Sequence, residues 1–145
     1  MCKVLQGNIK DGIRLLKLAI AKQENKGNRT LADLFRFSLA EVYLQIIDGK
    51  EKPPLLILLK NLSIILKVMA TASSGIGALM TSVLENPHFD PKGFHIGRAQ
   101  AILGLLYKAK KKRALALEHL TESKRILSQF GQTPILARVD AALVE

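Results

Sequence analysis

Apolar residues recur at intervals of three and four positions along almost the whole chain, and this spacing constrains the fold more than any other feature. Near the start, Ile9, Ile13, Leu16 and Ile20 follow one another at steps of four, three and four. Such steps place side chains on one face of an α-helix. Neither the alternation typical of strands nor a hairpin signal appears. The sequence therefore predicts an all-α fold.

Helix boundaries follow from capping residues and from glycine and proline. Asn8 is a suitable N-cap and Gly27 a suitable stop, while Pro53 and Pro54 suit the first turn of a helix. The stretch 86–93, which is rich in proline and glycine, predicts a loop. We predict helices at about residues 8–26, 30–48, 54–72, 74–86, 94–109, 113–129 and 134–144.

Length and composition indicate a folded, basic, intracellular protein. A chain of 145 residues, 48% apolar and 23% charged, is long enough for one domain over residues 1–145 and too apolar for disorder. Its net charge of +10 favours acidic or nucleic-acid partners. Cys2 is the single cysteine, and the N-terminal stretch carries no export signal, so we expect a cytoplasmic protein.

The most apolar segment, residues 54–73, raises the possibility of a membrane span. Lys60, Asn61 and Lys67 interrupt it, and each central lysine would cost about 2.5–3.5 kcal/mol on insertion. A buried helix whose lysines reach solvent is favoured, so no membrane span is expected. A membrane-surface role for residues 55–69 is a less favoured alternative.

Two segments share the pattern large-small-x-x-Tyr: LAEVY at 39–43 and LGLLY at 103–107. After the second segment come Ala116, Leu120 and Ser123. A small residue in such a pattern lets a neighbouring helix approach closely. We therefore expect Ala40, Gly104 and Ala116 to lie where helices meet.

This pattern resembles the tetratricopeptide repeat, a helix pair of about 34 residues. The resemblance implies antiparallel pairs stacked in a short right-handed solenoid of about six to seven helices. Gln100 stands where the repeat usually has Trp, and the two motifs lie 64 residues apart, out of register. The middle unit, residues 53–86, is therefore irregular.

The chain also resembles the C-terminal helical region of bacterial multidomain regulators that carry nucleotide-cyclase and ATPase domains. Segments such as LAEVYLQI, LGLLYKAKKKRALALEHL and ARVDAAL carry this resemblance. No cyclase or ATPase residues are present. The resemblance implies a non-catalytic signalling module whose partner is a protein or peptide, with a cyclase or ATPase domain as one candidate.

Repeat stacks bind ligands in the groove lined by their first helices. An apolar groove with a basic end would suit an amphipathic or extended peptide of acidic character. The repeat spacing assigns the groove to Leu34, Phe37, Glu41, Leu44, Arg98, Ala101, Leu105 and Lys108.

A run of cations occupies the predicted corner between two helices. One interpretation is solvation, since cations complement the negative end of a helix. An acidic protein partner is a second, and nucleic acid is a less favoured third because aromatic residues for base stacking are lacking. The patch consists of Lys108, Lys110, Lys111, Lys112 and Arg113.

We find no set of residues for catalysis, and we expect neither an enzyme nor a metal or cofactor site. His88, His95 and His119 do not pair at metal-ligand spacing. Glu118 and Glu122 stand one helical turn apart, but cations nearby favour a solvated face. The segment GIGALM lacks the third glycine of a dinucleotide loop.

Overall fold

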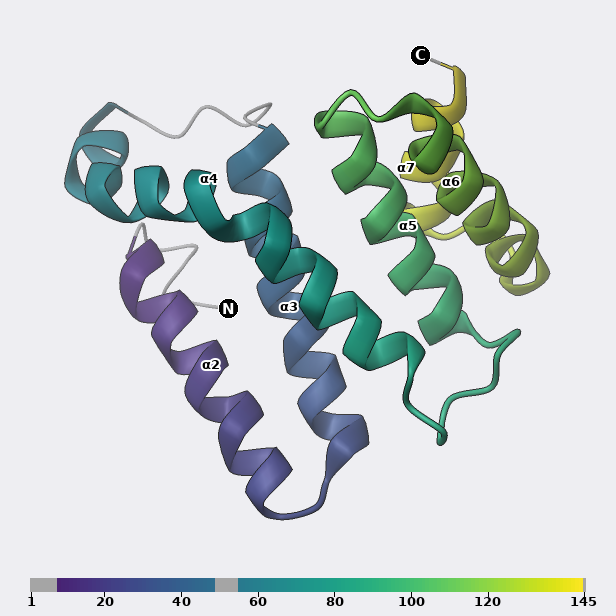
Figure 1. Cartoon of the computed structure of the whole chain (residues 1–145), viewed down its shortest axis with the longest axis horizontal. Coiled ribbons are helices and arrows are strands. Elements are labelled where there is room, and N and C mark those ends of the chain that lie inside the picture. Colours follow the sequence, from purple (N-terminus) through teal and green to yellow (C-terminus); the bar gives the residue numbers. More distant parts are fainter. Residues whose placement is uncertain (1–7, 49–54, 145) are drawn as a thin grey trace. The chain divides into compact units, whose positions relative to one another are not determined.

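The computed structural model describes residues 8–48 and 55–144, and every regular element in these ranges is a helix. The all-α prediction is thus confirmed for the described part of the chain. Cys2, Pro53, Pro54 and the side chain of Lys60 lie outside the described residues. The elements are α2 (Ile9–Asn25), α3 (Arg29–Asp48), α4 (Leu55–Leu84), α5 (Phe94–Ala109), α6 (Arg113–Leu127), the 3-10 helix η1 (Ser128–Phe130) and α7 (Pro134–Val144) (Figure 1).

The chain divides into two compact units, residues 1–75 and residues 76–145. The prediction of one domain over residues 1–145 rests on chain length and stays a prediction. The tetratricopeptide-like solenoid stays a prediction.

The two helices predicted at 54–72 and 74–86 belong to one element, α4 (Leu55–Leu84). This element is bent between its segments Asn61–Ala72 and Ser74–Leu84, at the place where the sequence predicts the boundary. Beside the bend, the hydroxyl of Ser74 donates to the carbonyl of Thr71 at 2.9 Å. A serine that bonds to the preceding turn often bends a helix without ending it.

In the first unit, α2 and α3 form a hairpin joined by residues 26–28 (Figure 1). Ile13, Leu16 and Ile20 are buried, as the spacing of apolar residues predicts. Ala40 on α3 is fully buried. The inward face of α2 and the buried position of Ala40 are therefore the ones that the sequence indicates.

A partly buried ion network joins these two helices near their turn. Arg36 on α3 donates to the carboxylate of Asp33 on the same helix and to that of Glu24 near the end of α2. Asp33 is fully buried and Arg36 nearly so. Because buried charges are costly without partners, this network fixes the end of α2 against the start of α3.

In the second unit, α5 and α6 pack closely because small residues lie at their contact. A Cβ atom on Gly104 would lie 2.6 Å from Cγ of Leu120, so a larger residue would force a shift. Ser123 donates its hydroxyl to the carbonyl oxygen of Gly97 at 2.8 Å. Ala116 is also buried. The prediction that short side chains lie where these helices meet is confirmed.

α7 packs against both helices of this pair. Ile135, Leu136 and Val139 form one apolar cluster with Ala101 of α5 and Leu120 of α6. The second unit is therefore a hairpin with a third helix covering one of its faces.

No single helix in the described ranges is long and apolar enough to cross a membrane. Two segments of α4, Asn61–Ala72 and Ser74–Leu84, meet the criteria of length and composition only as a bent pair. Lys67 is exposed, as expected of a lysine that reaches solvent, whereas Asn61 is buried.

Candidate interaction site

The groove residues predicted on α3 lie in different environments. Phe37 and Leu44 are core residues, with 0% and 2% of their surface exposed. Glu41 is half-buried, and Leu34 is exposed. The prediction that Phe37 and Leu44 line an open groove is therefore not met, because repeat spacing identifies a helix face but not what packs on it.

On α5, the predicted groove face is covered by α7. Ala101 is fully buried, and Leu105 packs against the cluster that includes α7. Lys108 donates from Nζ to the carbonyl oxygen of Ala142 at 2.6 Å. That oxygen is one of the last four carbonyls of α7, which have no partner within the helix. Arg98 is half-buried. Lys108 thus binds the C-terminal end of α7 and does not form the basic end of an open groove.

The remaining four cations of the predicted patch form the link between α5 and α6. We call Lys110, Lys111, Lys112 and Arg113 the basic corner. All four side chains are exposed, and no ion pair joins them to any residue that the structure describes. The corner is therefore a concentrated positive surface.

The backbone of this link is a tight helix-ending turn. The N–H of Lys111 donates to the carbonyl of Lys108, and that of Lys112 to the carbonyl of Tyr107, both at 2.9 Å. This pair of bonds defines the Schellman motif, whose penultimate residue takes the left-handed conformation. Lys111 accordingly has φ of +57° and is the one non-glycine residue with positive φ among those described.

The link between α2 and α3 is the same turn with different residues. Gly27 donates to the carbonyl of Glu24, and Asn28 to that of Gln23, both at 2.9 Å. Gly27 has φ of +70°. Asn28 also caps α3, since its side-chain oxygen accepts from the N–H of Leu31 at 3.2 Å. Here glycine and asparagine stand at the positions that favour them.

The corner between α5 and α6 places lysine at both of these positions. Lys111 stands where the first hairpin has glycine, and a left-handed conformation costs a residue with a side chain about 1–2 kcal/mol. Lys112 is the N-cap of α6 and makes no side-chain capping bond, whereas a polar cap is worth about 1 kcal/mol. The second hairpin therefore carries its cations at a local cost in stability.

Two exposed leucines follow the basic corner in the sequence, and their spacing of two places them on different sides of α6. Leu115 is 38% exposed and Leu117 is 57% exposed, and both lie in the first two turns of α6. We call the basic corner together with these two leucines the corner surface. It combines positive charge with accessible apolar area.

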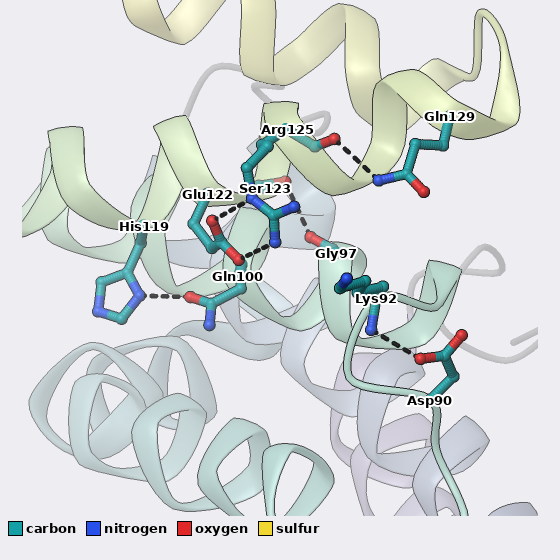
Figure 2. A network of polar contacts seen from close by, with 9 residues as sticks. All are labelled: Asp90, Lys92, Gly97, Gln100, His119, Glu122, Ser123, Arg125 and Gln129. Carbon is teal, nitrogen blue, oxygen red and sulfur yellow. Dashed lines mark hydrogen bonds and ion pairs between the residues drawn. The ribbon is translucent and has the colours of Figure 1, made fainter.

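The aromatic residue nearest the basic corner is already engaged. The ring of Tyr107 stacks on that of His119, with centroids 5.2 Å apart and planes inclined by 14°. His119 Nδ1 lies 2.6 Å from Oε1 of Gln100 (Figure 2). Gln100, which stands where the repeat usually has tryptophan, thus binds a histidine of the partner helix.

The candidate carboxylate pair separates into different environments. Arg125 donates to Glu122 through Nε at 2.8 Å and Nη2 at 2.6 Å (Figure 2). This hydrogen bond holds the pKa of Glu122 below its ordinary value, so Glu122 is ionised at neutral pH. Glu118 is exposed. An ionised, arginine-bound carboxylate lacks the proton that a general acid needs.

The described histidines are also separated. His95 stacks on Phe89, with centroids 4.7 Å apart, while His88 is exposed in the loop before α5. Within the described ranges, no group of three or more His, Cys, Asp or Glu residues is placed to hold a metal ion.

Comparison with known protein families, with curated proteins and with solved structures finds no match for this chain. The resemblance to the tetratricopeptide repeat and to bacterial cyclase and ATPase regulators therefore stays a prediction that rests on packing motifs. The corner surface is the strongest candidate site.

Proposed function

We propose that the chain is a non-catalytic helical module that binds an acidic segment of a protein partner through the corner surface. The observation that carries this proposal is the comparison of the two hairpin turns. One backbone turn occurs twice in the described residues, with favoured residues at Gly27 and Asn28 and with disfavoured lysines at Lys111 and Lys112. Departures from local preference that lack a structural gain are typical of functional positions.

The neighbouring leucines indicate the class of partner. Nucleic acid would meet the cations with its phosphates but offers little to Leu115 and Leu117. An acidic peptide segment with apolar residues can contact the cations together with one of these leucines. A segment of a cyclase or ATPase signalling domain is one candidate, as the resemblance to bacterial regulators implies.

The test separates binding from folding with one double variant. Lys111→Gly with Lys112→Asn gives the second turn the residues of the first, removes two charges and should stabilise the fold. The probe is a fluorescent peptide in which glutamates surround two leucines and prolines prevent helix formation. We expect about fivefold weaker binding, since two exposed charge contacts contribute about 0.5 kcal/mol each.

The matched control is Lys26→Gln with Lys92→Gln, which removes two exposed lysines elsewhere. It should leave peptide affinity within about twofold. Unchanged affinity of the turn variant would overturn the proposal. So would a wild-type preference for duplex DNA whose affinity falls steeply with salt, because that result would favour the nucleic-acid alternative.

A further inference from the structure

The outward side of α2 in the first unit is a second surface that combines cations with exposed leucines. Leu15 is 44% exposed and Leu18 is 55% exposed, and their spacing of three places them side by side on the helix. We call the set that surrounds and includes them the α2 outer face. It consists of Lys10, Arg14, Leu15, Lys17, Leu18 and Lys22, all of them exposed.

The carboxylates of α2 pair with only one cation of this face, Arg14. Asp11 accepts a hydrogen bond from the side chain of Asn8 at 2.7 Å and lies 3.6 Å from Arg14. Glu24 is bound by Arg36 of α3. Lys10, Lys17 and Lys22 are then left without a carboxylate partner among the residues that the structure describes.

The width of the apolar stripe distinguishes among possible occupants. The broad apolar side of α2 faces the core through Ile13, Leu16 and Ile20. The outward apolar stripe is narrow and consists of two leucines that follow one another along the helix. Helices that lie in a membrane interface present a broad apolar face to the lipid. A narrow stripe is typical of the seam between two packed helices.

The charge beside this seam selects the partner. In paired helices, residues that flank the apolar seam form ion pairs and set partner choice. Lys22 lies one helical turn after Leu18, and Lys17 precedes Leu18 in the sequence. Both lysines would repel a second copy of this chain, whose net charge is +10. A helix with leucines along its seam and carboxylates beside them is complementary in both respects.

We propose that the α2 outer face docks an acidic amphipathic helix of a protein partner. Leu15 and Leu18 form the seam, and Lys17 and Lys22 pair with carboxylates of that helix. The α2 outer face belongs to the first unit and the corner surface to the second. The two proposals are independent, and they differ in ligand: a helix for the α2 outer face and a non-helical segment for the corner surface.

The test uses the full chain and two synthetic helical peptides of identical leucine seam. One peptide carries glutamates beside the seam and the other carries lysines. Wild type should prefer the glutamate peptide by about tenfold or more, as measured by fluorescence anisotropy. Lys17→Glu with Lys22→Glu should reverse that preference, which a merely structural role of these lysines would not do.

A second variant tests the seam itself. Leu15→Gln with Leu18→Gln changes only exposed positions, so the circular dichroism spectrum should stay the same while both peptides bind at least about tenfold more weakly. Lys111→Gly with Lys112→Asn should leave binding of the helical peptide unchanged, which separates this surface from the corner surface.

Three results would overturn the proposal. The first is an unchanged preference in the charge-reversal variant, and the second is unchanged affinity after replacement of the leucines. The third is binding of wild type to phosphatidylserine vesicles, lost in the charge-reversal variant, with no binding of either peptide. That last pattern would identify the face as a membrane surface.

Discussion

Replacing Lys111 by glycine should stabilise the chain, although the change removes a whole side chain. Lys111 has φ of +57°, and this left-handed conformation costs a residue with a Cβ atom about 1–2 kcal/mol. Glycine avoids that cost but loses about 0.5–1 kcal/mol more conformational entropy on folding. The net expectation is a gain of about 0.5–1 kcal/mol in the free energy of unfolding.

The first hairpin provides the reciprocal experiment. Gly27→Lys introduces a side chain at the equivalent position, where φ is +70° and a Cβ atom would meet nothing within 4 Å. Its cost is therefore conformational and should match the gain at Lys111 in size with opposite sign. Lys112→Asn should add about 1 kcal/mol by capping α6 as Asn28 caps α3.

Urea unfolding followed by circular dichroism measures these changes. A gain of about 0.5–1 kcal/mol with a slope near 2 kcal/mol per molar urea shifts the midpoint upward by about 0.25–0.5 M at unchanged slope. If the two units unfold in separate steps, each variant should move only the transition of its own unit. A midpoint that falls in Lys111→Gly, or that stays constant in Gly27→Lys, would refute the reasoning.

Two further predictions concern packing and buried charge. Gly104→Ala should destabilise the second unit by about 1–3 kcal/mol, because the new Cβ would lie 2.6 Å from Leu120. Gly77→Ala, with open space around it, should instead raise the free energy of unfolding by about 0.5–1 kcal/mol. Equal urea midpoints for the two variants would contradict this prediction. Asp33→Ala should cost about 3 kcal/mol because Arg36 stays buried with one partner fewer, and a loss below about 1 kcal/mol in the same assay would show that Arg36 reaches solvent.

Much of the helical fold follows from the sequence because it depends on local spacing. The stripe at Ile13, Leu16 and Ile20 is buried as predicted, and Gly104 lies where α5 meets α6. The two helices predicted at 54–72 and 74–86 form one element that bends between Ala72 and Ser74. Sequence alone does not distinguish a serine that caps a new helix from one that bonds to the previous turn.

The predicted groove shows why a helix face is easier to predict than its exposure. Ala101, Leu105 and Lys108 share a face of α5, as the spacing requires, but α7 covers that face. Burial of this kind depends on a segment more than 25 residues later in the chain. The sequence also did not reveal that Leu15 and Leu18 are exposed, because leucines on a predicted helix are usually assigned to its buried side.

The basic run was recognised in the sequence, but its conformation was not. A signal was present: both hairpin links are three residues long, Lys-Gly-Asn at 26–28 and Lys-Lys-Lys at 110–112. Alignment of the two links would have placed Lys111 opposite Gly27. The comparison requires knowing where each helix ends, and that knowledge comes from the backbone bonds of the turn.

The solvation hypothesis for the basic corner can be weighed with magnitudes. Lys110 and Lys111 end α5, where each cation gains about 0.3–1 kcal/mol from the helix dipole, but Lys112 and Arg113 begin α6, where cations are disfavoured by a similar amount. The first turn of α6 holds no acidic residue to compensate. The two dipole effects therefore largely cancel, and the costs of the left-handed Lys111 and the missing cap at Lys112 stay unopposed within the described structure. Under the proposed function, a bound acidic segment would supply the opposing interaction.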